Sequence, residues 1–137
     1  MIIEFTVLGD PKAQKRHKHF KKGEFVGVYD PSAKDKKDFI AAIYQYAPET
    51  PIDEPIFLQA NFYFQRPKSH FRTGKNSHLL KDNAPVMHTG TPDVDNCYKY
   101  LSDSMNKIFY RDDSLICSIQ VTKQYSDKPR TEITIIT

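Results

Sequence analysis

The sequence predicts a single α+β domain in which two main helices pack on a mixed β-sheet. The chain has 137 residues, enough for one compact core and too few for two. Apolar residues make up 39% of it and aromatic residues 12%, which is sufficient to fill that core. Stretches typical of strands occur on both sides of stretches with helical spacing, so both kinds of element belong to one unit. We therefore expect residues 1–137 to form one domain.

The N-terminal part predicts two strands. Ile2–Leu8 is rich in β-branched and aromatic residues and is followed by Gly9 and Pro11, which end a strand. Glu24–Tyr29 is a shorter stretch of the same kind. We expect both to be strands.

A helix and a third strand are expected next. Lys34–Tyr46 has helical spacing of its apolar residues and stops before Pro48. The apolar positions in and just after this helix are Phe39, Ile40, Ile43, Tyr44 and Ala47. Ile56–Phe64 follows Pro55 and places Phe62 and Phe64 on one face, as a strand does.

The C-terminal half predicts a long loop, a second helix and two strands. Residues 66–90 have little periodicity, and a loop of this length in a small domain is usually functional or disordered. Asp93–Ile108 has one apolar arc at a spacing of 3.6 residues. That arc consists of Val94, Cys97, Tyr98, Leu101, Met105 and Ile108. Leu115–Tyr125 and Arg130–Ile136 are expected strands, joined by a turn at residues 126–129.

Charge is distributed unevenly although the net value is only +3. Residues 12–22 and 66–81 are two basic stretches without a single acid, whereas aspartates gather in the C-terminal half. Taken alone, each basic stretch is as well explained by a solvated surface loop. Beside an acidic metal site, both would serve as phosphate grips. The candidate DNA-binding residues are Lys15, Arg16, Lys18, Arg66, Lys68 and Arg72.

Other sequence features exclude several classes. No apolar run is long enough to span a bilayer, and Met1–Phe5 lacks the features of a signal peptide. The two cysteines, Cys97 and Cys117, have no metal-ligand spacing. We therefore expect a cytoplasmic protein with free thiols and no membrane partner.

The candidate chemistry lies on the second helix. Asp95, Lys99 and Asp103 follow one another at intervals of four residues and form a polar stripe beside the apolar arc. Asp93 stands at the helix start, and Asp112-Asp113 precedes the next strand. Once the chain doubles back, three or four of these carboxylates could surround one divalent cation.

A cation is expected because clustered carboxylates repel unless an ion neutralises them. Ligands that are all oxygen favour Mg²⁺, with Mn²⁺ as the alternative. Such an ion could activate water against a phosphodiester, and Lys99 could balance the developing negative charge. A calcium loop is excluded, because its sixth and twelfth positions are Tyr98 and Ser104 instead of Gly and Glu.

Each feature also has an ordinary structural explanation. Asp93 could simply cap the helix. Asp95 and Lys99 could form a surface ion pair worth roughly 0.3–0.5 kcal/mol. Asp112-Asp113 could belong to a turn.

The motifs resemble the RusA family of Holliday-junction resolvases. The strongest is Pro-Asp-Val-Asp-Asn-Cys-Tyr-Lys at 92–99, followed by Asp103 and by Tyr-Arg-Asp-Asp-Ser-Leu-Ile at 110–116. Arg-Pro-Lys-Ser-His at 66–70 is similar to a basic family motif, and Gly-Asp-Pro at 9–11 with Arg16 resembles the family's N-terminal loop. Gln14 stands where the family often has Lys, and His17 where it often has Pro.

The resemblance implies a RusA-like fold and a homodimer that places two active sites on a four-way DNA junction. It implies metal ligation by Asp93, Asp95 and Asp113, with Lys99 assisting catalysis. Further candidates for the site are Asp103, Asp112 and Asn96. The expected activity is Mg²⁺-dependent hydrolysis of paired phosphodiesters by metal-activated water, which resolves Holliday junctions. The rivals are a less selective branched-DNA or flap nuclease and a non-catalytic DNA-binding protein.

Overall fold

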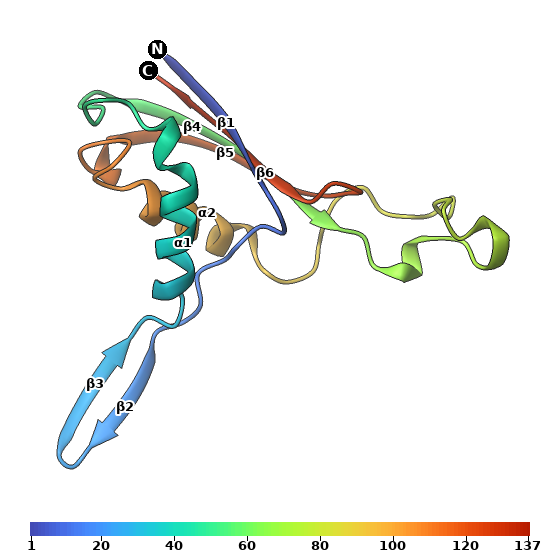
Figure 1. Cartoon of the computed structure of the whole chain (residues 1–137), viewed down its shortest axis with the longest axis horizontal. Helices are drawn as coiled ribbons and strands as arrows, with labels where there is room; N and C mark the ends of the chain where they lie inside the picture. Colours follow the sequence, from blue (N-terminus) through green and yellow to red (C-terminus); the bar gives the residue numbers. More distant parts are fainter.

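A computed structural model describes all residues, 1–137, and its central element is a four-stranded mixed sheet (Figure 1). The strands are β1 (Ile2–Leu8), β4 (Ile56–Gln65), β5 (Ile116–Ser126) and β6 (Arg130–Ile136). Their order is β1-β6-β4-β5. β4 is parallel to β5, and the other pairs are antiparallel. The predicted α+β class with a mixed sheet is confirmed.

The order of the strands separates β5 from β6 although only a short turn joins them. β4 lies between these two strands, so the turn at residues 126–129 crosses the end of β4 and does not close a hairpin. In β4 the buried residues Ile56, Leu58, Ala60 and Phe62 alternate with more exposed ones, as expected of a strand covered on one face.

Both helices lie on the same side of the sheet (Figure 1). They are α1 (Ala33–Ile43) and α2 (Val94–Met105). Helix α2 buries Cys97, Leu101 and Met105, which belong to the predicted arc and join the core cluster with β4 and β6. Neither helix has the length and apolar character that a bilayer span requires.

Helix α1 is shorter than the helix expected from the sequence, and a 3₁₀ turn at Tyr44–Tyr46 follows it. The turn changes the direction of the last side chains. Tyr44 is exposed, whereas the ring of Tyr46 stacks on Phe5 of β1 at 4.9 Å. The change of helical pitch explains why the predicted apolar face does not continue through Tyr44.

Two segments extend from this body. Strands β2 (Lys18–Lys22) and β3 (Phe25–Tyr29) form a separate hairpin, although the basic stretch that contains β2 shows no strand pattern in the sequence. The segment 66–90 is irregular, as predicted, with 3₁₀ turns at Lys68–His70 and Gly74–Asn76. In Figure 1 the hairpin and the irregular segment project from the body in different directions.

Candidate active site at the start of helix α2

The segment that leads into α2 is fixed by β5. The ammonium group of Lys123 on β5 donates to the carbonyl oxygens of Gly90 and Pro92, both at 2.7 Å. The backbone N–H of His88 also donates to the carbonyl of Lys123. These bonds hold the chain in place immediately before Asp93, so β5 sets the position of the helix start.

Asp93 occupies the N-cap position of α2, but its carboxylate caps no backbone N–H. Its backbone carbonyl accepts the hydrogen bond from Cys97 at 3.2 Å. The side chain is exposed and forms no ion pair. The simple capping role that the sequence allowed therefore does not occupy the carboxylate of Asp93.

Asp95 and Lys99 lie one helical turn apart on α2, and both are exposed. No ion pair joins them, and neither side chain pairs with any other residue. The surface ion pair that the sequence allowed is therefore absent. A carboxylate and an ammonium group remain available to something outside the chain.

The neighbouring residues Asp112 and Asp113 differ in their contacts. Asp112 accepts a hydrogen bond from the backbone N–H of Ser114 at 3.1 Å and pairs with Lys107 at 3.0 Å. The bonds from Ser114 and Lys107 hold the pKa of Asp112 well below its usual range. The exposed carboxylate of Asp113 has no ion pair. Asp112 thus has a structural role in the turn, and Asp113 does not.

The carboxylates influence different residues of α2. Burial raises the pKa of the Cys97 thiol to about 11. The charge of Lys123 lowers this pKa, and the charges of Asp95 and Asp93 raise it. Burial also raises the pKa of Tyr98, and Asp113 and Asp103 contribute in the same direction. No three His, Cys, Asp or Glu groups in the chain form a ready-made metal cluster. The ligand set inferred from the sequence therefore stays a prediction.

A polar hollow lies beside this part of the helix. It has a volume of about 210 Å³ and is lined by Gln14, Lys15, Arg16, His17, Asn96 and Lys99. The backbone N–H of Gln14 donates to the carbonyl of Asn96 at 3.0 Å, which fixes the N-terminal basic segment against α2. Two predicted DNA-binding residues and two candidate site residues thus share one hollow that can receive an anionic group.

Comparison with known proteins places this arrangement in a family. The family model for the endodeoxyribonuclease RusA matches residues 9–136. The chain belongs to the RusA family. The protein YqaN of Bacillus subtilis (strain 168), described as uncharacterized, is 36% identical over 136 residues, which cover 97% of this chain and 94% of YqaN. Membership of the RusA family implies endodeoxyribonuclease activity on Holliday junctions and therefore binding of branched DNA.

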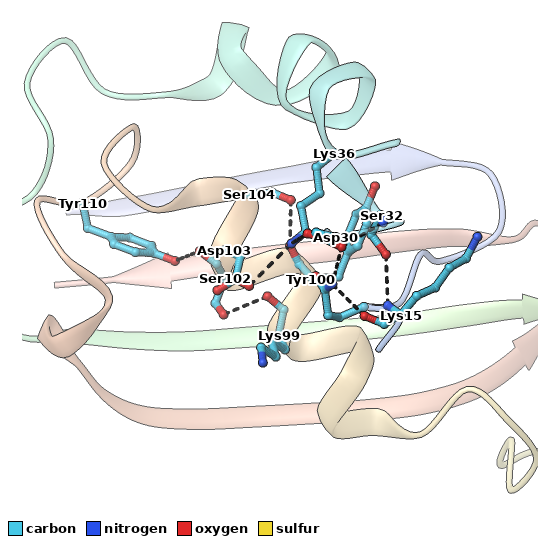
Figure 2. A network of polar contacts seen from close by, with 11 residues as sticks. Lys15, Asp30, Ser32, Lys36, Lys99, Tyr100, Ser102, Asp103, Ser104 and Tyr110 are labelled. Carbon is cyan, nitrogen blue, oxygen red and sulfur yellow. Dashed lines mark hydrogen bonds and ion pairs between the residues drawn. The ribbon is translucent and has the colours of Figure 1, made fainter. Parts of the chain in front are cut away.

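The RusA match includes Asp103, but the structure gives this residue a different setting from that of Asp95. Its carboxylate lies 3.6 Å from the Nζ of Lys36 on α1. The same ammonium group lies 3.2 Å from Asp30 (Figure 2). Asp103 therefore helps to join α1 to α2, which already accounts for its charge.

Asp30 is a residue that sequence reasoning missed. Its carboxylate accepts hydrogen bonds from the Gln14 side chain and the Ser32 backbone, both at 2.8 Å, and from Lys36. Burial acts to raise the pKa of Asp30, but these hydrogen bonds outweigh it and lower the pKa. Nothing local in the sequence indicated the contacts of Asp30 with Gln14 and Lys36.

The network around Asp30 fixes the basic segment beside the RusA motif. Ser32 Oγ accepts the backbone N–H of Lys15 at 3.0 Å, so both ends of the β2–β3 hairpin are tied together (Figure 2). Gln14, which replaces the lysine often found in the family, donates its amide to Asp30. The departure from the family pattern therefore has a definite structural role here.

The predicted DNA-binding residues of segment 66–81 differ in availability. Arg66 donates to the carbonyl of Pro85 at 2.7 Å and lies over the ring of Tyr125. Arg72 pairs with Asp82 at 3.0 Å. Lys68 is exposed and has no ion pair. The two arginines thus shape this segment, and Lys68 presents an unpaired charge.

Proposed function

We propose that this protein resolves Holliday junctions by metal-dependent hydrolysis of one phosphodiester in each of two opposing strands. The observation that carries this proposal is the set of unpaired charges at α2. Asp93 at the start of α2, Asp95 and Lys99 on α2, and Asp113 in the turn before β5 all lack an internal ion pair. Exposed ionised groups that the fold leaves unpaired, at the motif positions of a nuclease family, are candidates for catalysis.

The donor set fits a hard divalent cation. Asp93, Asp95 and Asp113 offer carboxylate oxygens only, which suits Mg²⁺ or Mn²⁺ better than Zn²⁺. Asp93 and Asp95 are two residues apart, so a cation would relieve their mutual repulsion. When bound, Mg²⁺ would supply Lewis acidity at the phosphate and a lowered pKa of water.

Lys99 is proposed to balance negative charge at the scissile phosphate. Lys99 lines the polar hollow with Lys15 and Arg16, and no carboxylate pairs with its ammonium group. Lys15 and Arg16, which line the same hollow, would hold the adjoining backbone phosphates. Lys99 would then stabilise charge in the transition state, and the N-terminal segment would position the DNA.

Two cuts at a fixed separation need two sites, which a two-fold homodimer supplies. The face of the sheet opposite the helices is open, and β-sheet register places Ile2, Phe57 and Ile136 side by side on it. Phe57 is 50% exposed and Ile2 is 64% exposed. This apolar end of the open face supports the proposed dimer.

The test is cleavage of a labelled synthetic four-way junction in Mg²⁺ and in EDTA. The proposal expects paired nicks in opposing strands with Mg²⁺ only. Asp38→Asn is a matched control, because Asp38 is an exposed, unpaired aspartate on α1 outside the site. Single nicks on flaps and junctions alike would indicate a less selective nuclease. Tight binding without any nick would indicate a DNA-binding protein and overturn the proposal.

A further inference from the structure

The β2–β3 hairpin projects from the body of the protein as an arm (Figure 1). We call residues 18–29 the arm. Its two strands pair only with each other, from Lys18 opposite Tyr29 to Lys22 opposite Phe25. All of its residues are exposed except Gly27. A hairpin without a sheet or helix to cover it needs a reason to carry large apolar side chains.

One face of the arm is aromatic. Cross-strand register and two-residue alternation place Phe20, Phe25 and Tyr29 on the same face. Ring centroids of Phe20 and Phe25 are 5.9 Å apart, and those of Phe20 and Tyr29 are 6.3 Å apart. The three side chains are nevertheless 44%, 64% and 47% exposed, respectively. The rings therefore contact one another while keeping much of their surface in solvent.

Gly27 makes the position of the central ring possible. It lies directly opposite Phe20, and a Cβ atom at position 27 would collide with ring carbons of Phe20. The distal part of the Phe20 ring thus occupies the space above Gly27 of β3. This arrangement leaves the outer surface of the ring available to a planar group.

The charge of the arm indicates the chemistry of its partner. Lys18 and Lys22 share the aromatic face, Lys21 lies on the other face, and Glu24 is the arm's only acid. Exposed rings bordered by ammonium groups match nucleic acid, in which planar bases alternate with phosphates. A protein partner of similar apolar character would leave these lysines to be desolvated without compensation.

The arm is anchored beside the candidate active site. Gln14 and Lys15 before β2 are bonded to Asp30 and Ser32 after β3. Gln14 is also bonded through its backbone to Asn96 on α2. The base of the arm is therefore continuous with the hollow that contains Lys99, so a DNA strand lying in the hollow can extend along the arm.

We infer that the aromatic face of the arm stacks on bases that lose their stacking neighbours at the branch point of the DNA. This inference rests on the proposed function, because a four-way junction offers bases that leave their stack where the strands exchange. Stacking on aromatic rings depends little on sequence, since every base has a planar face. The phosphates next to those bases would contact Lys18 and Lys22.

The test uses a four-way junction with 5-iododeoxyuridine at the branch point, bound in EDTA so that metal-dependent cleavage is prevented. Irradiation is expected to crosslink the base to Phe20, Phe25 or Tyr29, identified by mass spectrometry. Phe20→Leu should lose most of the crosslink and bind the junction about 10-fold more weakly, with unchanged affinity for linear duplex. Phe20→Trp should retain both properties.

Val28→Ala is the matched control, because Val28 is an exposed apolar residue on the opposite face of the arm. It should behave like the wild type. Crosslinks confined to other segments, or equal weakening by Val28→Ala, would overturn the inference. Circular dichroism checks that each variant is folded.

Two further measurements separate the possible failures. Sedimentation without DNA is expected to give the same oligomeric state for Phe20→Leu and wild type. A shift toward monomer would mean that the arm binds a second copy of the chain, which would also overturn the inference. Paired nicking by the wild type in Mg²⁺ tests the proposed function separately. Paired nicking without a crosslink to the arm would overturn the inferred stacking of bases on the arm but would support the proposed function.

Discussion

Lys36 on α1 lies with its Nζ atom 3.6 Å from Oδ2 of Asp103 on α2. This ion pair engages the carboxylate of Asp103, which lies one helical turn after Lys99. Because Asp95 forms no ion pair, Lys99 has no carboxylate partner on either side. The arrangement separates a structural aspartate from an unpaired lysine on one helix face.

Lys99→Ala should therefore affect turnover more than stability. We expect single-turnover cleavage to fall by roughly 10²-fold or more, with little change in melting temperature or junction affinity. Lys99→Arg should restore only part of the rate, because a planar guanidinium does not reproduce a compact ammonium group. Wild-type cleavage by Lys99→Ala under saturating Mg²⁺ would remove Lys99 from the mechanism.

Asp95→Asn should separate binding from cleavage. The change removes one negative charge with almost no change in shape, so junction affinity should stay equal or increase while cleavage is abolished. The loss of an acid from the first turn of α2 should cost only about 0.3–1 kcal/mol of stability. Gel-shift, cleavage and melting measurements on the same preparation check this, with Asp38→Asn as the control. Retained cleavage would contradict the assignment.

Mg²⁺ should stabilise the wild-type fold through the three candidate ligands. A ligand at ten times its Kd that binds only the folded state adds about 1.4 kcal/mol to the free energy of unfolding. Asp93→Asn and Asp113→Asn should each reduce this increment, measured as the shift in melting temperature between Mg²⁺ and EDTA. An equal shift in the wild type and both variants would place the bound ion elsewhere.

The basic residues should differ in their effect on the salt dependence of binding. Lys18→Ala and Lys68→Ala remove unpaired charges, so each should reduce the slope of log K against log salt by about 0.9. Arg72→Ala also breaks the ion pair with Asp82 and should alter the shape of segment 66–90 as well. An unchanged slope for both lysine variants would mean that these residues are ordinary solvated surface.

Asp30→Asn should weaken the fold in a pH-dependent manner. The folded state lowers the pKa of Asp30 from its ordinary value of 3.8, so its stabilising effect is fully present above that value. The effect is lost as the pH falls through the lowered folded-state pKa. The variant should be less stable than wild type by about 1–2 kcal/mol at pH 7. This difference should shrink below about pH 4, measured by chemical denaturation across pH.

A constant difference between pH 7 and pH 3 would contradict the role of the Asp30 charge. Asp38→Asn again serves as the control, because Asp38 has no ion pair in the structure. If the loss of stability belongs to the Asp30 network, Asp38→Asn should show the same dependence of stability on pH as the wild type.

Much of this structure follows from local patterns. The β-branched and aromatic residues of Ile2–Leu8 and the apolar arc of α2 predicted these two elements. Strand β2 could not be predicted in this way, because Lys-His-Phe-Lys-Lys has no buried face and exists as a strand only through pairing with β3. The position of β4 between β5 and β6 likewise depends on long-range pairing.

The candidate site shows the same division. The polar stripe of Asp95, Lys99 and Asp103 was visible in the sequence because its spacing repeats the helical turn, whereas the ligand set of Asp93, Asp95 and Asp113 was implied by the resemblance to the RusA family. The different settings of Asp103 and Asp113 were not visible, because Asp103 is engaged by Lys36, which lies 67 residues earlier in the chain. No local pattern distinguishes an aspartate that joins two helices from one that remains unpaired.

The parallel pairing of β4 with β5 has a consequence for the order of folding. Ile56 and Ile116 face each other across a crossover that contains the irregular segment and all of α2. Closing so long a loop is entropically costly, so this pairing is expected to form late. Lys123 secures the carbonyls of Gly90 and Pro92 only after β5 is in place. A partly folded chain would therefore lack an organised start of α2, where the proposed metal ligands Asp93 and Asp95 lie.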